Sequence, residues 1–217
     1  MPEWDINFKK RSLKTISLLG LLVAMNFNLY GQANWTLENE KDGIRISSRP
    51  ASSSQFNDIR VELDLPGNIE QLKGILLDVD HYKDWSYATK KSVLIRKLGV
   101  GRVIYFSEFE VPWPATNRYF YSSIELKEDS VTHSLTVFAV NLPNYLPAYK
   151  DLVEVSFTKG IWKISTLSNK SIHVVYTLEL NPGGSLPSWV INLFSSKGPL
   201  ATFENIKQKM TALNSQK

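Results

Sequence analysis

Apolar and polar residues follow two different rhythms along the chain, and the last segment has the rhythm of a helix. Between residues 185 and 213, apolar side chains recur at steps of three and four residues, which places them on one helix face. These residues are Val190, Leu193, Phe194, Leu200, Phe203, Ile206, Met210 and Leu213. Ser185 can cap this helix, and Gly198-Pro199 predicts a kink because proline has no N–H for the helical hydrogen bond. A helix with such a long apolar face needs a partner surface.

The rest of the chain has the pattern of β-strands. Three short β-like runs lie within 35–65, and Asn68 can cap a helix that runs to about Asp80. From 89 to 181, almost every residue belongs to a strand pattern. The turns that separate these strands lie at 99–101, 128–130 and 168–170. Consecutive hairpins form an antiparallel sheet, and long strands curl. We therefore predict an α+β fold in which a curved antiparallel sheet wraps around the long C-terminal helix.

Composition and charge exclude several classes of protein. Hydrophobic residues make up 43% of the 217 residues and aromatic residues 12%, which is enough for a folded core. The formal net charge is +4, and +2 of it lies in residues 1–33. The remaining charge is too small and dispersed to indicate a nucleic-acid-binding protein. The chain has no cysteine, which excludes disulfides, thiolate metal sites and cysteine nucleophiles.

The beginning of the chain has the layout of a secretory signal peptide. A basic cluster at 9–11 precedes an apolar run at 16–25, and Gly31 and Ala33 are the small residues expected before a cleavage site. We expect cleavage before Asn34 and export to the periplasm or the cell exterior. A retained N-terminal anchor is the alternative. The expected division of the chain is a signal peptide, 1–33, and one folded domain, 34–217.

Three stretches of the folded part resemble the START domain, the StAR-related lipid-transfer module of the helix-grip superfamily. They are DGIRISSR at 42–49, VPWPATNRYF at 111–120, and GIWKI at 160–164 continued by GGSLPSWVIN at 183–192. The resemblance covers about 35–213, with the stretches in the family's order. It implies a helix-grip fold with a hydrophobic tunnel between sheet and helix that holds one lipid-like molecule.

Two positions depart from the family's pattern. Tyr119 follows Arg118 where the family usually has an aspartate, so the role of that acid does not transfer to this chain. Ile124 stands where some sterol-binding members have an arginine that lines the cavity. The second departure weakens the case for a sterol ligand.

The strand patterns also predict a cavity with one polar spot. On two neighbouring strands, large apolar residues alternate on one face with charged ones, and a buried charge is costly unless it is paired. These face residues are Phe106, Glu108, Arg118, Phe120 and Ile124. We hypothesise that Arg118 pairs with Glu108 or Glu110 and orients a headgroup. In the alternative, both acids are rim residues in water.

The stretch 141–151 is the longest irregular segment, and it carries apolar side chains on what should be a surface loop. By resemblance it matches the loop that covers the tunnel mouth together with the last helix. We predict a lid made of this loop and the helix; in the alternative, the loop packs on its own domain. The predicted ligand contacts from these segments are Leu142, Tyr145, Trp189, Leu193 and Phe194.

The leading interpretation is a non-enzymatic protein that binds a lipid or another hydrophobic molecule, for transfer or sensing. We expect a monomer with transient membrane contact, no nucleic-acid partner, and no catalytic residue, metal or cofactor. Asp78, Asp80 and Asp84 lie beside His81 but lack the spacing of a calcium loop, which favours a polar helix end. Two alternatives remain: an aromatase/cyclase-type enzyme acting on a polyketide on the same fold, and an interaction domain with a filled core. The lipid interpretation requires a hollow interior.

Overall fold

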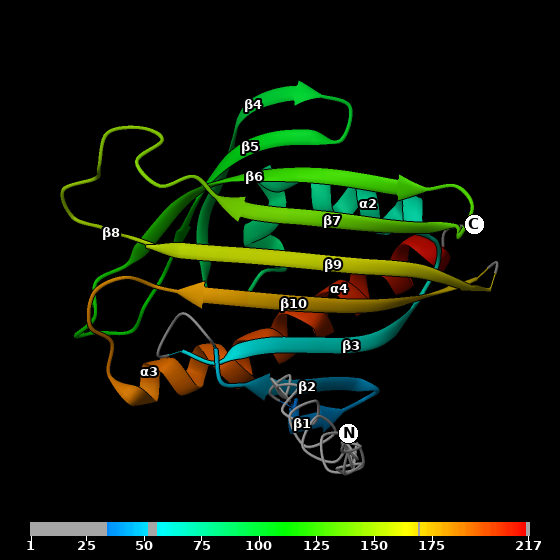
Figure 1. Cartoon of the computed structure of the whole chain (residues 1–217), viewed down its shortest axis with the longest axis horizontal. Helices are drawn as coiled ribbons and strands as arrows, with labels where there is room; N and C mark the ends of the chain where they lie inside the picture. Colours follow the sequence, from blue (N-terminus) through cyan, green and yellow to red (C-terminus); the bar gives the residue numbers. More distant parts are fainter. Residues whose placement is uncertain (1–33, 52–55, 169, 216–217) are drawn as a thin grey trace, which may run out of the picture. The chain divides into compact units, whose positions relative to one another are not determined.

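The computed structural model describes residues 34–51, 56–168 and 170–215, which form one large sheet with helices against one face (Figure 1). The expected signal peptide lies outside these residues. The strands are β1 Thr36–Lys41, β2 Ile44–Arg49, β3 Asp58–Pro66, β4 Thr89–Gly99, β5 Arg102–Phe109, β6 Arg118–Asp129, β7 Ser134–Asn141, β8 Val153–Glu154, β9 Phe157–Ser168 and β10 Ser171–Asn181. The predicted antiparallel sheet is therefore present, and its strand boundaries differ from the sequence prediction by a few residues.

The order of strands in the sheet is β1-β2-β3-β10-β9-β7-β6-β5-β4, and the two-residue strand β8 pairs in parallel with β6. The hairpins β4–β5, β6–β7 and β9–β10 are the three that the turn sequences predict. The chain crosses from β3 to β4 at the far edge through a helical segment, and β10 returns to pair with β3. The order thus joins the first three strands to a long antiparallel meander.

The helical segment after β3 begins at the predicted cap. The Asn68 side chain accepts a hydrogen bond from the Gln71 backbone N–H at 3.0 Å, and the Gln71 side chain accepts one from the Asn68 N–H at 3.0 Å. This reciprocal capping box satisfies two N–H groups that a helix start leaves free. The helix α2, Ile69–Leu77, buries Leu72 and Leu76 and is followed by the 3₁₀ helix η1, Val79–Asp84.

The polar residues at this helix end bind one another and the backbone. His81 Nδ1 lies 2.8 Å from Asp78 Oδ1, and Asp80 Oδ1 accepts a hydrogen bond from the Leu94 N–H at 2.7 Å. Across the described ranges, no group of three or more potential metal ligands is found. These contacts explain why the acids lie together.

The C-terminal helix consists of α3, Ser188–Asn192, the π-helical turn η2, Leu193–Lys197, and α4, Gly198–Ser215. Pro187, and not Ser185, occupies the N-cap position, with no side-chain hydrogen bond. The break predicted at Gly198-Pro199 takes the form of a π turn, in which the Gly198 N–H bonds to the Leu193 carbonyl five residues back.

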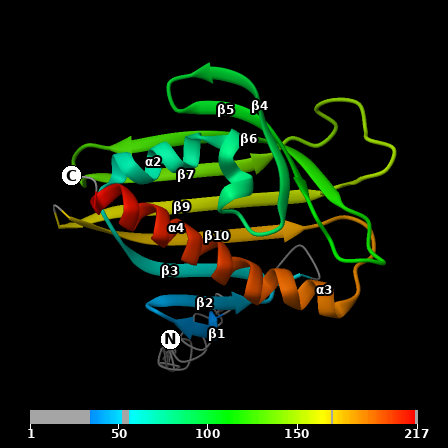
Figure 2. The same ribbon diagram turned by 180° about the vertical axis from the view of Figure 1, so that it is seen from behind.

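The helices α2 and α4 lie on the same face of the sheet (Figure 2). In α4, the apolar residues Phe203, Ile206 and Met210 are buried, as their spacing predicts. The Phe203 ring lies 5.2 Å from the Trp162 ring and 5.5 Å from the Tyr176 ring, so α4 packs on β9 and β10. Within the described part of the chain, no helix has both the length and the apolar character to cross a membrane.

Candidate functional site

A cavity of about 260 Å³ lies between the sheet and the C-terminal helix. One water occupies roughly 30 Å³ in the liquid, so the interior is hollow well beyond the size of a water or two. The wall is mostly aromatic and aliphatic. Its aromatic residues include Tyr82, Trp85, Tyr87, Tyr105, Phe109, Phe120, Trp162, Tyr176, Phe194 and Phe203.

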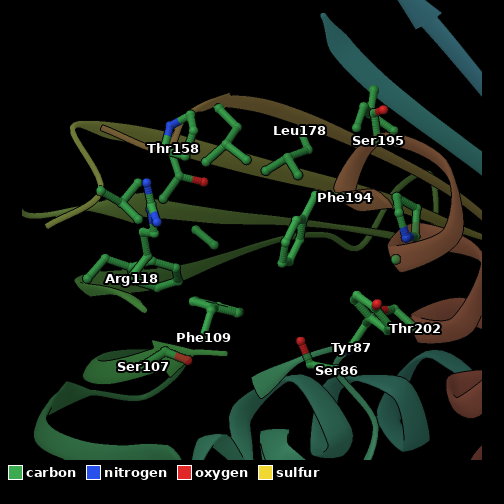
Figure 3. A pocket seen from close by; sticks show the side chains of 18 of the residues that line it. Ser86, Tyr87, Ser107, Phe109, Arg118, Thr158, Leu178, Phe194, Ser195 and Thr202 are labelled. Carbon is green, nitrogen blue, oxygen red and sulfur yellow. The ribbon is translucent and has the colours of Figure 1, made fainter. Parts of the chain in front are cut away.

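Polar side chains of the wall lie at two opposite ends of the cavity. Arg118 of β6, Thr158 of β9 and Ser107 of β5 lie toward one end, and Ser195 and Thr202 of the C-terminal helix lie toward the other (Figure 3). Thr202 Oγ1 accepts a hydrogen bond from the Tyr87 N–H at 3.0 Å, which ties the helix to the segment before β4. The helix end of the cavity is therefore held by its own hydrogen bonds.

Arg118 is the one charged side chain among the described residues that line the cavity. It is 4% exposed. Its Nη2 donates to the Ser185 carbonyl oxygen at 3.3 Å, its Nη1 donates to the Thr116 carbonyl oxygen, and its buried Nε has no partner. Burial lowers the pKa of the Arg118 guanidinium, and no neighbouring carboxylate opposes that shift. The group still carries its charge at neutral pH.

Three buried tyrosines of the wall contribute no negative charge. Burial raises the pKa values of Tyr82, Tyr105 and Tyr176 well above the ordinary value. All three therefore stay neutral phenols at physiological pH. Tyr82 donates a hydrogen bond from its hydroxyl to the Leu76 carbonyl oxygen at 2.6 Å, which holds its ring in the wall.

The hypothesis of an ion pair between Arg118 and Glu108 or Glu110 is wrong. The register of β5 and β6 pairs Phe109 with Arg118 and Glu108 with Tyr119. Since side chains alternate between the faces of a sheet, Arg118 points into the cavity and Glu108 to the outer face. There Glu108 accepts hydrogen bonds from Lys90 at 2.9 Å and from Asn117 at 3.1 Å.

The loop 142–152 packs against the outer face of the sheet, away from the cavity. Leu142 and Tyr145 lie on the buried aromatic cluster Phe106, Tyr119 and Tyr121, and the Tyr145 ring is 5.6 Å from that of Tyr121. This is the alternative in which the loop packs on its own domain. The assignment of Phe106, Leu142 and Tyr145 to the cavity wall is corrected, because these side chains cover the opposite surface.

Of the remaining predicted contacts, Phe120 and Phe194 lie in the cavity wall together with Arg118. Ile124 shares the inner face but lies in the main hydrophobic core, 2% exposed. Trp189 is 49% exposed and does not line the cavity. Leu193 lines a neighbouring groove. Leu193 begins the π turn, where the regular helical spacing on which the prediction rests is interrupted.

A groove lies beside the cavity, between the segments 87–88 and 110–113 and the start of the π turn at 193–194. Its wall consists of Tyr87, Ala88, Glu110, Val111, Pro112, Trp113, Leu193 and Phe194. Tyr87, Val111 and Phe194 also line the cavity, so the groove and the cavity are adjacent and share part of their walls. Trp113 is 89% exposed at the groove. We call this groove the mouth groove.

Several wall residues escaped the sequence prediction. Ser107 and Phe109 lie on the odd-numbered face of β5, which the sequence pattern assigned to the opposite side. Thr158, Trp162 and Leu178 come from β9 and β10, where apolar residues on both faces hide the inward one. Only the pairing of β6 with β5 would have revealed the correct face.

Comparison with known proteins identifies the architecture. A search against protein-family models finds no match. An uncharacterized protein of Pseudomonas aeruginosa is 25% identical over 198 residues, which cover 90% of this chain and 97% of that protein. The phosphatidylcholine transfer protein of Rattus norvegicus is 27% identical over 171 residues, 76% of this chain and 78% of that protein.

Among solved structures, the STAR-related lipid transfer protein (fragment 25–204) from Xanthomonas axonopodis has a TM-score of 0.74 and 24% sequence identity. The superposition covers 82% of this chain and 98% of that one. At this identity the likeness shows the fold: a helix-grip architecture of ten strands around a C-terminal helix.

Proposed function

Because the chain has the START fold, we propose that it binds a lipid or another hydrophobic small molecule in the cavity between the sheet and the C-terminal helix. The observation that carries this proposal is the hollow, largely apolar interior. An empty apolar void of about 260 Å³ would destabilise a protein by several kcal/mol, because its lining atoms lose packing partners. A hydrophobic ligand restores those contacts.

Two similar proteins support the same class of ligand. One is called a phosphatidylcholine transfer protein and the other a STAR-related lipid transfer protein. Both names describe the transfer of lipids. We extend this function to the present chain because its cavity has the apolar lining that such a ligand requires.

We further propose a binding protein, without enzymatic activity. An enzyme of the aromatase/cyclase type needs a positioned acid or base in its pocket. Glu108 lies on the outer face of the sheet, and Glu110 lies in the mouth groove and outside the cavity. Burial raises the pKa values of the wall residues Tyr82, Tyr105 and Tyr176, which keeps them protonated at neutral pH.

The groove at 87–88, 110–113 and 193–194 is the proposed route for the ligand. Trp113 is 89% exposed on one side of it, and Trp189 is 49% exposed on the helix that forms the other side. Tryptophan is the residue type that favours the boundary between membrane and water. We propose that these two side chains touch a membrane transiently while the ligand passes.

The experiment is extraction of the purified full chain with organic solvent, followed by mass spectrometry. We expect one hydrophobic molecule in stoichiometric amount. In Ala139→Phe, a ring fills the cavity, and the bound molecule should be lost. Val140→Phe places the same ring on the opposite face of β7 and should retain it. A wild-type protein that carries no such molecule and takes none up from a lipid mixture would refute the proposal.

We also propose that the chain is exported and works as a monomer. The basic and apolar segments at 9–11 and 16–25 support export, with cleavage before Asn34. The intact mass of the protein from its native host, together with its mass in solution, tests both statements. A mass that still includes residues 1–33 would favour the retained anchor.

A further inference from the structure

Arg118 brings a positive charge into the apolar cavity without a carboxylate partner among the residues that the structure describes. Its terminal nitrogen atoms donate to the carbonyl oxygens of Thr116 and Ser185, and its Nε is buried without a partner. These carbonyl groups orient the guanidinium, but neutral dipoles do not cancel its charge. A buried charge without a counter-ion is strongly unfavourable in a folded protein.

A second buried polar atom without a partner lies in the same part of the wall. Ser107 is 1% exposed, and its Oγ forms no hydrogen bond. The register pairs Ser107 with Phe120, which makes Ser107 a diagonal neighbour of Arg118 on the cavity face. Thr158 adds a third polar side chain at this end (Figure 3). Buried polar groups in folded proteins are nearly always satisfied. Of the buried side-chain atoms without a partner in the described part of the chain, only these two belong to residues that line the cavity, where a ligand atom can reach them.

We propose that this end of the cavity binds the terminal anion of a single-chain lipid, either a carboxylate or a phosphate monoester. The inference rests on the proposed function and names the class of its ligand. The oxygen atoms of such an anion accept hydrogen bonds from the Arg118 Nε–H and the Ser107 hydroxyl and supply the missing negative charge. The aromatic wall contacts the hydrocarbon chain.

The small volume of the cavity favours a ligand with one chain. Its volume of about 260 Å³ is smaller than the roughly 300–1,000 Å³ of pockets for drug-sized ligands. A diacyl phospholipid needs space for a second chain and places its phosphate between the chains and a further headgroup. Here the charged end has one guanidinium, and the described wall away from it has no second charge.

The test compares ligands that differ only in the head. Calorimetric titration of the full chain with tetradecanoic acid, tetradecyl phosphate and tetradecan-1-ol measures the effect of the anion at constant chain length. At least one anion should bind about 10- to 100-fold more tightly than the alcohol, because charge-assisted hydrogen bonds are strong. The tighter of the two anions identifies the headgroup.

Equal affinity for the anions and the alcohol would overturn this inference and leave the proposed function intact. Binding of none of these ligands, nor of a diacyl lipid, would overturn both. Tighter binding of a diacyl phospholipid than of either single-chain anion would overturn the single-chain assignment. These comparisons use the wild-type protein and do not depend on the folding of a variant.

Variants then locate the anion. Arg118→Met should remove the preference for the anions over the alcohol, and Ser107→Ala should reduce it several-fold. Lys90→Met removes the same charge from the outer face, where Lys90 pairs with Glu108, and should keep the full preference. A full preference in a folded Arg118→Met protein would overturn the assignment. If Arg118→Met does not fold, Ser107→Ala decides in its place.

Discussion

Glu108, on the outer face of the sheet, has charged and polar partners, whereas Arg118 in the cavity has no carboxylate partner among the described residues. The Glu108 carboxylate is bound by Lys90 and Asn117, and Asn117 Oδ1 accepts a hydrogen bond from the Val111 N–H at 3.0 Å. Burial acts to raise the pKa of Glu108, but the hydrogen bonds from Lys90 and Asn117 outweigh it, so the pKa lies below its ordinary value. Ionised Glu108 therefore holds the segment that leads to the mouth groove.

The sign of this shift predicts the behaviour of Glu108→Gln. A carboxylate with a lowered pKa stabilises the fold above its ordinary pKa of 4.5, and that stabilisation is lost as the pH falls through the lowered value. The variant should lower the free energy of unfolding at pH 7 by less than about 1 kcal/mol, since Lys90 is half exposed. Denaturant titrations should show the difference closing below pH 4.5. The affinity for the ligand should not change. A lower affinity would show that Glu108 takes part in ligand binding after all.

Two glycines with the same backbone conformation differ in their surroundings. Gly183 has φ +72°, and a Cβ there would lie 2.5 Å from the Glu154 carbonyl oxygen, whereas Gly43 has φ +78° and no atom within 4 Å. Gly43→Ala should cost about 1–2 kcal/mol from backbone strain alone. Gly183→Ala should cost clearly more in the same chemical unfolding measurement, because the backbone of 154 has to move. Equal costs would show that this segment is loosely held.

Sequence alone predicted which residues share a face within one strand, but not how neighbouring strands match. Arg118, Phe120 and Ile124 do lie on one face. The segment between β5 and β6 is eight residues long, so no tight turn fixes the register. A shift of one residue exchanges the two faces of a strand, and this is the error that placed Glu108 beside Arg118.

At the scale of elements, local signals were the most informative. The cap at Asn68 and the three hairpin turns depend on neighbouring residues only, and the structure contains them. The Gly198-Pro199 pair correctly marked a break, but its form as a π turn was not predicted. Tyr87 lies 3.0 Å from where a Gly198 Cβ would be, a close approach that the sequence pattern does not reveal. The loop 142–152 was correctly seen as apolar, yet its pattern did not say which surface it covers.

We expect ligand binding to change amide hydrogen exchange in one of the two predicted lid segments and not in the other. Residues 190–200 border the cavity and the mouth groove, whereas 143–151 packs on the outer face of the sheet. On saturation with ligand, exchange in 190–200 should slow, because the ligand fixes the π turn, and exchange in 143–151 should stay the same. Mass-spectrometric exchange measures both in one sample. Slowing confined to 143–151 would restore that loop as the lid.

In the molecule as a whole, the two halves of the long C-terminal helix contact different parts of the interior. The half with Ile206 and Met210 packs as solid core on the sheet's concave face, and the half from Ile191 to Phe203 borders the cavity. Since the solid half alone supplies a well-packed interior, the other half can remain hollow. A stable fold and a vacant cavity therefore coexist in one small domain.

The hollow interior also makes the protein sensitive to hydrostatic pressure. Unfolding reduces the volume of the system, and the reduction grows with the internal void that water eliminates on opening the chain. The ligand-free protein should therefore unfold at lower pressure than either its complex or Ala139→Phe, in which the same space is occupied. The pressure at which this protein unfolds therefore reports how much of the cavity is empty, and a bound ligand should raise that pressure.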